Sequence, residues 1–167
     1  LLTLTIYSFN NQIRFNSSGI YNMPIGKRDF NKSIRENVVD FYYSFKDKNV
    51  TFFSKDFSKI KPEEIHNPFY YCDPPYILGT ASYNESDGWT VDDEKRLLAF
   101  LDEVNKKGAK FALSNVIFHK GQEHKLLKEW SERNGYNVIQ LNFNYNNSSY
   151  HKKDKKDKTI EVLITNY

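Results

Sequence analysis

Apolar positions recur along this chain with two different spacings. Short runs of apolar and aromatic residues, typical of buried strands, occupy residues 69–72, 110–113, 136–143 and 159–165. Between these runs the spacing changes to three or four residues, which predicts helices over about 90–107 and 123–133. Strands that alternate with helices and finish in a strand pair indicate an α/β sheet.

Both predicted helices have one apolar face. Thr90 is placed to cap the first helix, with Asp93 three residues later as in a capping box, and Gly108 follows its last turn. The apolar residues of this helix are Leu97, Leu98, Leu101 and Val104. Those of the second helix are Leu126, Leu127 and Trp130. Each helix is therefore expected to pack on the sheet.

The first third of the chain follows a different pattern. Residues 1–7 are apolar with interleaved Thr and fit either a strand or a helix end. The amide-rich stretch over residues 10–28 suggests a hairpin-like projection. A helix is predicted from Asn31, with apolar residues at Ile34, Val38, Phe41, Tyr42 and Phe45. Residues 51–54 are predicted to form a strand that ends just before Asp56 and Phe57.

The strand over residues 69–72 runs directly into Asp73-Pro74-Pro75-Tyr76. Proline cannot donate to a β-ladder, so Pro74 and Pro75 end the strand, and the residue before a proline is held extended. Asp73 is therefore expected at the carboxyl end of a strand, where ligands bind in open α/β sheets. A carboxylate, a rigid backbone and the ring of Tyr76 suit a planar ligand with an exocyclic amine. The alternative is a solvated Asp in a Pro-Pro turn.

Composition narrows the class of protein. The chain has 167 residues, enough for one domain with a core, and 16% of them are aromatic. Its net charge is +3, but residues 1–61 hold ten Lys or Arg against five Asp or Glu, and such a basic half can face phosphates. The mixed-sign run over residues 152–158 is expected to be a solvated loop.

Several classes of site are excluded. The single Cys72 rules out a disulfide framework and a cysteine-rich zinc site. The four histidines show no metal-ligand spacing, so no metal is expected. No apolar run approaches the roughly 18 residues of a membrane span, and no signal-peptide pattern is visible. A cytoplasmic location is expected.

The tetrapeptide Asp73-Pro74-Pro75-Tyr76 resembles the D-P-P-Y motif of DNA amino-methyltransferases, and three further segments extend the resemblance to their Dam-like D12 class. Residues 14–28 are similar to the R-x-N…G-x-[FY]-N-x-P-x-G-[KR] recognition segment, residues 111–115 to a strand ending in Ser-Asn, and residues 161–167 to the terminal strand. These four motifs in the correct order cover nearly the whole chain. Residues 88–90 and 111–116 most resemble methyltransferases of type II restriction–modification systems.

The resemblance implies an α/β, Rossmann-like S-adenosylmethionine-dependent methyltransferase fold, present in part, with an inserted target-recognition segment. Residues 1–50 would be the DNA-binding recognition segment, and residues 51–167 the carboxyl-terminal part of the catalytic domain. The class holds the methionine end of its cofactor with an F-x-G-x-G-type loop, yet no two of the seven glycines here are separated by a single residue. With its start at Leu1, the chain is expected to be a portion of a longer enzyme. A missing amino-terminal segment or a partner chain would supply the loop.

The resemblance assigns catalytic roles to Asp73, Pro74, Pro75 and Tyr76. Asp73 and the Pro74 carbonyl would each accept one hydrogen of adenine N6, which positions the nitrogen for methyl transfer. The base must first be flipped out of double-stranded DNA, and Tyr76 would stack on it at a gain of roughly 1–3 kcal/mol. The alternative for Tyr76 is a core aromatic without contact to substrate.

Cofactor and DNA contacts are implied as well. Asp73, with Asp56 and Phe57, would border S-adenosylmethionine; the alternative for the latter pair is a loop acid beside a core Phe. The DNA-binding residues implied in the recognition segment are Arg14, Asn16, Pro24, Lys27 and Arg28. The first three would contact base edges and the two last would contact phosphates. Without the resemblance, a surface hairpin with amide-rich turns is the simpler interpretation.

Two other functions stay open. Methyl transfer to cytosine N4 uses the same amine chemistry, but a recognition-like segment ahead of Asp73 favours the adenine class. A DNA-binding remnant or subunit without methyl transfer would fit the missing glycine loop.

Overall fold

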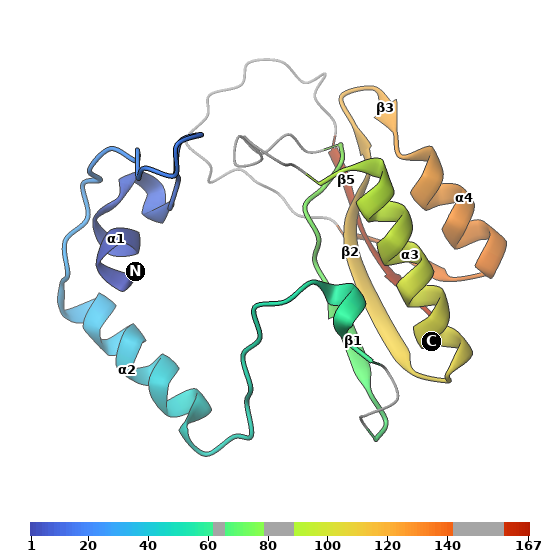
Figure 1. The fold of residues 1–167 in the computed structure, drawn as a ribbon, viewed down its shortest axis with the longest axis horizontal. Coiled ribbons are helices and arrows are strands. Elements are labelled where there is room, and N and C mark those ends of the chain that lie inside the picture. The colour runs from blue at the N-terminus through green and yellow to red at the C-terminus, as the bar shows by residue number, and fades with distance from the viewer. Residues whose placement is uncertain (62–65, 79–88, 142–158) are drawn as a thin grey trace. The chain divides into compact units, whose positions relative to one another are not determined.

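The computed structural model describes residues 1–61, 66–78, 89–141 and 159–167 (Figure 1). The chain divides into two compact units, Leu1–Lys55 and Asp56–Tyr167, and each is described by itself. No helix among the described residues is long and apolar enough to cross a membrane.

The first unit contains two helices and a hairpin between them. Helix α1 spans Leu2–Tyr7, a 3-10 turn η1 spans Phe9–Asn11, and helix α2 spans Lys32–Lys46. Antiparallel bridges join Ser8 to Ile25 and Phe15 to Tyr21. Gly26 is required where the two sides meet, because a Cβ atom there would lie 2.5 Å from the carbonyl oxygen of Ser8. The projection predicted from the turn residues is therefore a hairpin held by these bridges.

The structure decides three expectations for the first unit. Residues 1–7, which fitted a strand or a helix end, form helix α1. The strand predicted over residues 51–54 is wrong, because this segment has no ladder partner in the described part of the chain. Phe52 and Phe53 are 78% and 70% exposed there. The helix predicted from Asn31 is confirmed, and the Asn31 side chain caps it by accepting a hydrogen bond from the N–H of Ile34.

The second unit is built on one mixed sheet. Its strands are β1 (Phe69–Cys72), β2 (Lys110–His119), β3 (Gln122–Glu123), β4 (Asn137–Leu141) and β5 (Thr159–Thr165). The order is β1-β2-β5-β4, and β3 pairs with the end of β2. Strand β1 is parallel to β2, whereas β5 is antiparallel to both of its neighbours. A βαβ unit that continues into antiparallel strands is thus the core of this unit.

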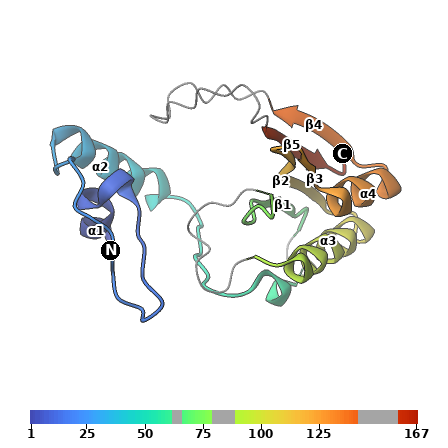
Figure 2. The ribbon, with the colours of Figure 1, turned by 90° about the horizontal axis from the view of Figure 1, so that it is seen from above.

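Two long helices cover one face of this sheet, as Figures 1 and 2 show. They are α3 (Val91–Lys106) and α4 (Lys125–Asn134). Strand residues that alternate toward the helices are fully buried, among them Phe111 and Leu113 of β2 and Ile164 of β5. They pack against Leu101 and Leu127 of the helices, which are also fully buried. The predicted apolar faces therefore form the core.

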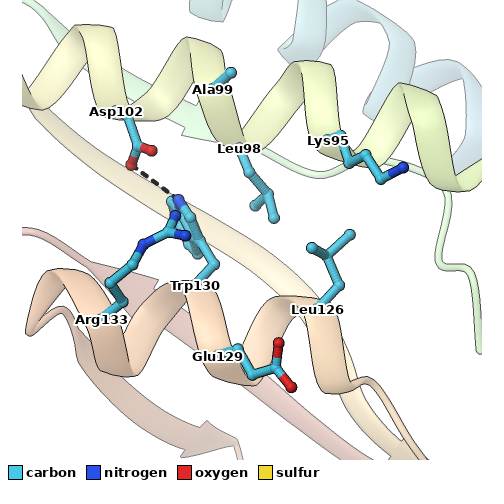
Figure 3. A pocket seen from close by; sticks show the side chains of 8 residues that line it. All are labelled: Lys95, Leu98, Ala99, Asp102, Leu126, Glu129, Trp130 and Arg133. Atoms are coloured by element: carbon cyan, nitrogen blue, oxygen red, sulfur yellow. Dashed lines mark hydrogen bonds between the residues drawn. The ribbon is translucent and has the colours of Figure 1, made fainter.

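A carboxylate fastens the two helices to each other. Asp102 of α3 accepts hydrogen bonds from Trp130 Nε1 of α4 at 2.8 Å and from the Tyr136 hydroxyl at 3.1 Å. Figure 3 shows the Trp130 bond at one end of a groove between the helices that measures about 190 Å³. Burial and the neighbouring Asp102 raise the pKa of Tyr136 to about 12. The hydrogen bonds of Asp102 therefore bridge this groove and hold the two helices together.

The ends of several elements differ from the prediction. Strand β2 continues six residues beyond Leu113, because residues up to His119 pair with β5 and β3. Helix α4 begins at Lys125 because Gln122 and Glu123 form β3. Strand β1, the capping box of α3 and strand β5 are confirmed. The glycine-rich loop over residues 79–88 and the charged run over residues 152–158 lie outside the described residues.

Candidate functional site

The site centres on the turn that follows β1. The parallel pairing of Cys72 with Leu113 aligns the ends of β1 and β2, so that Asp73 and Ser114 lie at the same level of the sheet. The Tyr76 hydroxyl donates a hydrogen bond to Asp73 Oδ1 at 3.0 Å and lies 3.0 Å from Ser114 Oγ, from which it can accept one. Carboxylate and ring are thus held together at the carboxyl end of β1.

These contacts give the Tyr76 ring a fixed orientation. Its hydroxyl has one proton to donate and oxygen lone pairs to accept, so both bonds form at once. Ser114 is 8% exposed and is anchored in the centre of the sheet between β1 and β5. The pKa of Tyr76 is raised, chiefly by burial. The phenol therefore stays protonated and keeps donating to Asp73.

An aromatic cleft of about 270 Å³ opens beside the turn. Its lining is mostly apolar and consists of Phe57, Ile60, Tyr70, Tyr71, Cys72, Asp73, Pro74, Trp89, Leu97 and Phe100. The rings of Phe57 and Trp89 have centroids 6.0 Å apart, and Phe57 is at the same distance from Phe100. Flat walls of this kind suit a planar heterocycle.

The pair Asp56 and Phe57 begins the short 3-10 turn η2 (Phe57–Lys59), not the end of a strand as predicted. The Asp56 carboxylate caps this turn by accepting a hydrogen bond from Ser58 N–H at 2.9 Å. The two Ser58 bonds and Arg96, 3.4 Å from Asp56 Oδ2, lower the pKa of Asp56. The Arg96 guanidinium also lies 5.2 Å from the Phe57 ring centroid. Asp56 is thus an ionised acceptor beside the cleft.

These groups fit the adenosine end of S-adenosylmethionine. The Phe57 and Trp89 rings offer stacking surface, and Asp73 offers a hydrogen-bond acceptor in the lining. Asp56, outside the lining, offers a further acceptor next to Phe57. The chain has no G-x-G loop to receive the methionine end. In the described ranges, no three His, Cys, Asp or Glu residues lie close enough together to hold a metal ion.

The residues implied in DNA binding lie in the hairpin of the first unit. Arg14 uses Nε and Nη2 to bond Asn22, at 2.9 Å to Oδ1 and 3.2 Å to the carbonyl oxygen. Asn16 Oδ1 accepts from the N–H groups of Ser18 and Ile20, which closes the hairpin tip. Both side chains therefore brace the hairpin.

The other three residues of this set are on its surface. Pro24, Lys27 and Arg28 are exposed. Arg28 donates to Asn11 Oδ1 at 2.8 Å, which ties the end of the hairpin to η1.

Two contacts of the site were not anticipated from the sequence. One is the bond between Ser114 and Tyr76, which are 38 residues apart. The other is the bond from Trp89 to Glu94, a buried carboxylate on α3. A signal for Glu94 existed, because it precedes Leu97, Leu98 and Leu101 by three, four and seven residues and so lies on the apolar face.

Comparison with known proteins extends this description. The family model for the D12 class N6 adenine-specific DNA methyltransferase matches residues 1–158. Type II methyltransferase M.FokI of Planomicrobium okeanokoites is 41% identical over 174 residues, covering 100% of this chain and 26% of the relative. Modification methylase StsI of Streptococcus sanguinis is 40% identical with the same coverage. DNA adenine methylase of Escherichia coli (strain K12) is 22% identical, covering 84% of this chain and 49% of that protein.

The mixed sheet has an Asp-Pro-Pro-Tyr turn at the carboxyl end of β1 and an aromatic cleft beside it, and this makes the chain an α/β protein. Open α/β sheets bind ligands at the carboxyl ends of their strands. Among α/β proteins of this kind, the match to the family model identifies the family. The chain belongs to the D12 class of N6 adenine-specific DNA methyltransferases. It spans about a quarter of the length of the first two relatives.

Proposed function

We propose that this chain carries the target-recognition and catalytic motifs of a DNA adenine-N6 methyltransferase of a type II restriction–modification system. The methyl donor would be S-adenosylmethionine and the substrate an adenine flipped out of double-stranded DNA. The observation that carries the proposal is the arrangement of Asp73, Pro74 and Tyr76 at the end of β1 beside the aromatic cleft. The order β1-β2-β5-β4 supports a partial Rossmann-like methyltransferase sheet.

Asp73 and Pro74 would position the amine. The lone pair of adenine N6 is delocalised into the ring, so the amine is a poor nucleophile. Hydrogen bonds from its two hydrogens to the Asp73 carboxylate and the Pro74 carbonyl favour a tetrahedral nitrogen whose lone pair is available. Pro75 keeps the Pro74 carbonyl in place because its ring restricts the backbone. When bound, the donor supplies an electrophilic methyl group.

Tyr76 would receive the flipped base. Stacking of a base on an aromatic ring contributes roughly 1–3 kcal/mol, and a ring already held in place loses less entropy on binding. The bonds from its hydroxyl to Asp73 and Ser114 provide this order. Asp73 would therefore have two roles: it orients the ring that receives the base, and it accepts a hydrogen bond from the amine of that base.

The cleft would hold the adenosine of the donor. Phe57 and Trp89 would flank its adenine ring, with Asp56 and Asp73 as acceptors near its polar groups. The methionine end requires a glycine-rich loop, which a further segment or a partner chain would contribute.

The first unit would bind DNA. Lys27 and Arg28 would contact phosphates, and Pro24 a thymine methyl group. Arg14 and Asn16 would read base edges by exchanging their hairpin bonds for bonds to bases. The missing glycine loop favours one alternative function, a DNA-binding subunit without methyl transfer of its own.

The test is transfer of labelled methyl groups to unmethylated DNA, by the chain alone and with an added polypeptide that carries the glycine-rich loop of the Planomicrobium relative. We expect little turnover by the chain alone and clear formation of N6-methyladenine with the added segment. Asp73→Ala should lower that turnover at least a hundredfold, because the amine loses its main acceptor.

A matched control is Asp92→Ala, which removes an exposed carboxylate of α3 that contacts only Lys95 in the described structure. It should leave turnover unchanged. DNA binding without turnover in either mixture would favour the DNA-binding subunit, and N4-methylcytosine as product would favour the cytosine class.

A further inference from the structure

A buried carboxylate lies behind the cleft. Glu94 of α3 is 0% exposed, and burial of a polar side chain is unfavourable unless hydrogen bonds replace its contacts with water. Its Oε2 accepts a hydrogen bond from Trp89 Nε1 at 2.6 Å, and its Oε1 accepts one from Asn115 Nδ2 at 2.9 Å. Both oxygens are therefore engaged.

The partners of Glu94 are themselves fixed. Asn115 Oδ1 accepts from the N–H of Val116 at 2.7 Å, which orients the amide with its nitrogen toward Glu94. His124, 5% exposed, accepts at Nδ1 from the N–H of Leu127 at the start of α4. The other ring nitrogen, Nε2, lies 3.4 Å from Glu94 Oε1 and makes no hydrogen bond within the described residues. Strand β2 and helices α3 and α4 thus converge on one carboxylate.

Only one member of this network reaches the cleft. Trp89 lines it together with Phe57, whereas Glu94, Asn115 and His124 do not. Trp89 directly precedes Thr90, the residue that caps α3, so its backbone is held at the helix start. The bond to Glu94 then fixes the rotation of the indole about its side-chain bonds.

Stability alone does not account for such a network. Replacing a buried ionic or polar group by well-packed apolar residues is often neutral or stabilising. What a buried polar network does provide is a single side-chain arrangement. Here both Glu94 oxygens are hydrogen-bonded, one by Trp89 and one by Asn115. Here the side chain held in a single arrangement is that of Trp89, which forms a wall of the cleft.

We propose that Glu94, supported by Asn115 and His124, is a positioning residue that holds the Trp89 ring against the adenine ring of the methyl donor. The inference rests on the proposed function in that the donor occupies this cleft. Glu94 itself touches neither donor nor DNA and acts through Trp89.

The test uses S-adenosylhomocysteine as the probe and nuclear magnetic resonance of the indole N–H groups. The chain has two tryptophans, so Trp89→Phe assigns the two resonances. We expect the probe to shift the Trp89 resonance and leave that of Trp130 in place. Trp89→Ala and Glu94→Gln should each weaken binding about tenfold. In Glu94→Gln, one amide hydrogen faces the amide hydrogens of Asn115, so the network no longer closes.

Two further variants separate positioning from folding. Glu94→Gln combined with Asn115→Asp exchanges donor and acceptor, and should restore affinity to within about twofold. Glu103→Gln, an exposed glutamate on the same helix, should have no effect. The proposal is overturned if folded Glu94→Gln binds the probe as tightly as wild type, or if the probe leaves the Trp89 resonance unmoved. Absence of methyl transfer to DNA in the mixture with the added glycine-loop polypeptide, beside intact probe binding, would count against the proposed function alone.

Discussion

At the scale of single residues, the site depends on Ser114, which acts through its contact with the Tyr76 side chain. Ser114 lies in the middle of the sheet, yet its hydroxyl reaches the Tyr76 hydroxyl beyond the end of β1. Asp73 holds the same hydroxyl from the other side. Three oxygen atoms, one from β2 and two from the turn after β1, therefore set the direction of one ring.

We predict that Ser114→Ala lowers kcat about fivefold and changes the KM for DNA less. The lost hydrogen bond is worth about 1 kcal/mol, and Tyr76 would hold the flipped base less well in the transition state. Steady-state kinetics of methyl transfer by the loop-complemented protein measures both constants. Ser114→Thr keeps the hydroxyl and should recover most of the rate. A loss of thermal stability in Ser114→Ala with unchanged kcat would show a structural role only.

At the scale of elements, helix α3 connects the functional parts. Its first turn contains the capping box of Thr90 and Asp93, its buried face contains Glu94, and Arg96 reaches Asp56. Hydrogen bonds from Thr90 and the contact with Arg96 lower the pKa of Asp93 to about 2. The start of this helix is therefore held in place by a carboxylate that must stay ionised.

The pH dependence of the capping box follows from the sign of this shift. Asp93 has a lower pKa in the folded protein than the roughly 3.9 of an unfolded chain, so its contribution to stability is full above that value. It is lost as the pH falls from about 4 toward 2. Urea unfolding should show a stability gap between wild type and Asp93→Asn that is constant above pH 5 and shrinks below pH 4. A gap that grows on acidification would contradict this assignment.

Thr90→Ala tests the same capping box by removing the hydroxyl of its N-cap residue. Removing an N-cap hydroxyl costs about 1 kcal/mol of stability. We expect this loss in urea unfolding at pH 7, together with broadening of the Trp89 indole resonance, because Trp89 is the preceding residue. Asp92→Asn, in the same turn, is the control and should leave the resonance sharp.

The elements that the sequence revealed are those specified by neighbouring residues. The cap at Thr90, the apolar face of α3 and the prolines after Cys72 are local signals, and the structure contains each of them. The second half of β2 was missed because its pairing partner, β5, lies about forty residues further along the chain. The contacts of Ser114 and Glu94 were missed for the same reason. Hydrogen bonds between side chains of different elements produce no periodic pattern in the sequence. The positions of Asp73 and Tyr76 were predictable, but not what holds them.

At the scale of the whole molecule, the basic surplus and the aromatic cleft fall in different units. The unit Leu1–Lys55 holds eight Lys or Arg against four Asp or Glu, whereas the cleft and the Asp-Pro-Pro-Tyr turn lie in the unit Asp56–Tyr167. Binding of DNA by the first unit would be electrostatic in large part. Its affinity should therefore fall steeply with salt.

We predict that Lys27→Ala weakens binding to duplex DNA of any sequence and makes the slope of log K against log salt concentration less negative by about 0.9. A phosphate contact releases one counterion and carries no sequence information. Titrations between 50 and 200 mM salt, roughly the range in which such slopes are read, provide the measurement. Lys106→Ala on α3 should leave the slope unchanged. Equal slopes for wild type and Lys27→Ala would exclude a phosphate contact.

The cleft also contains Cys72, which carries the single thiol of the chain. The reactivity of this thiol matters because a methyl donor bound in the cleft would present an electrophilic methyl group. Burial raises the pKa of Cys72 to about 11, so near neutral pH only about one molecule in ten thousand has the thiolate form. Thiolates, unlike thiols, are strong nucleophiles toward sulfonium carbons. A donor held in this cleft would therefore lie beside a sulfur that does not compete with adenine. The same burial that packs β1 against α3 would then keep the protein from alkylating itself.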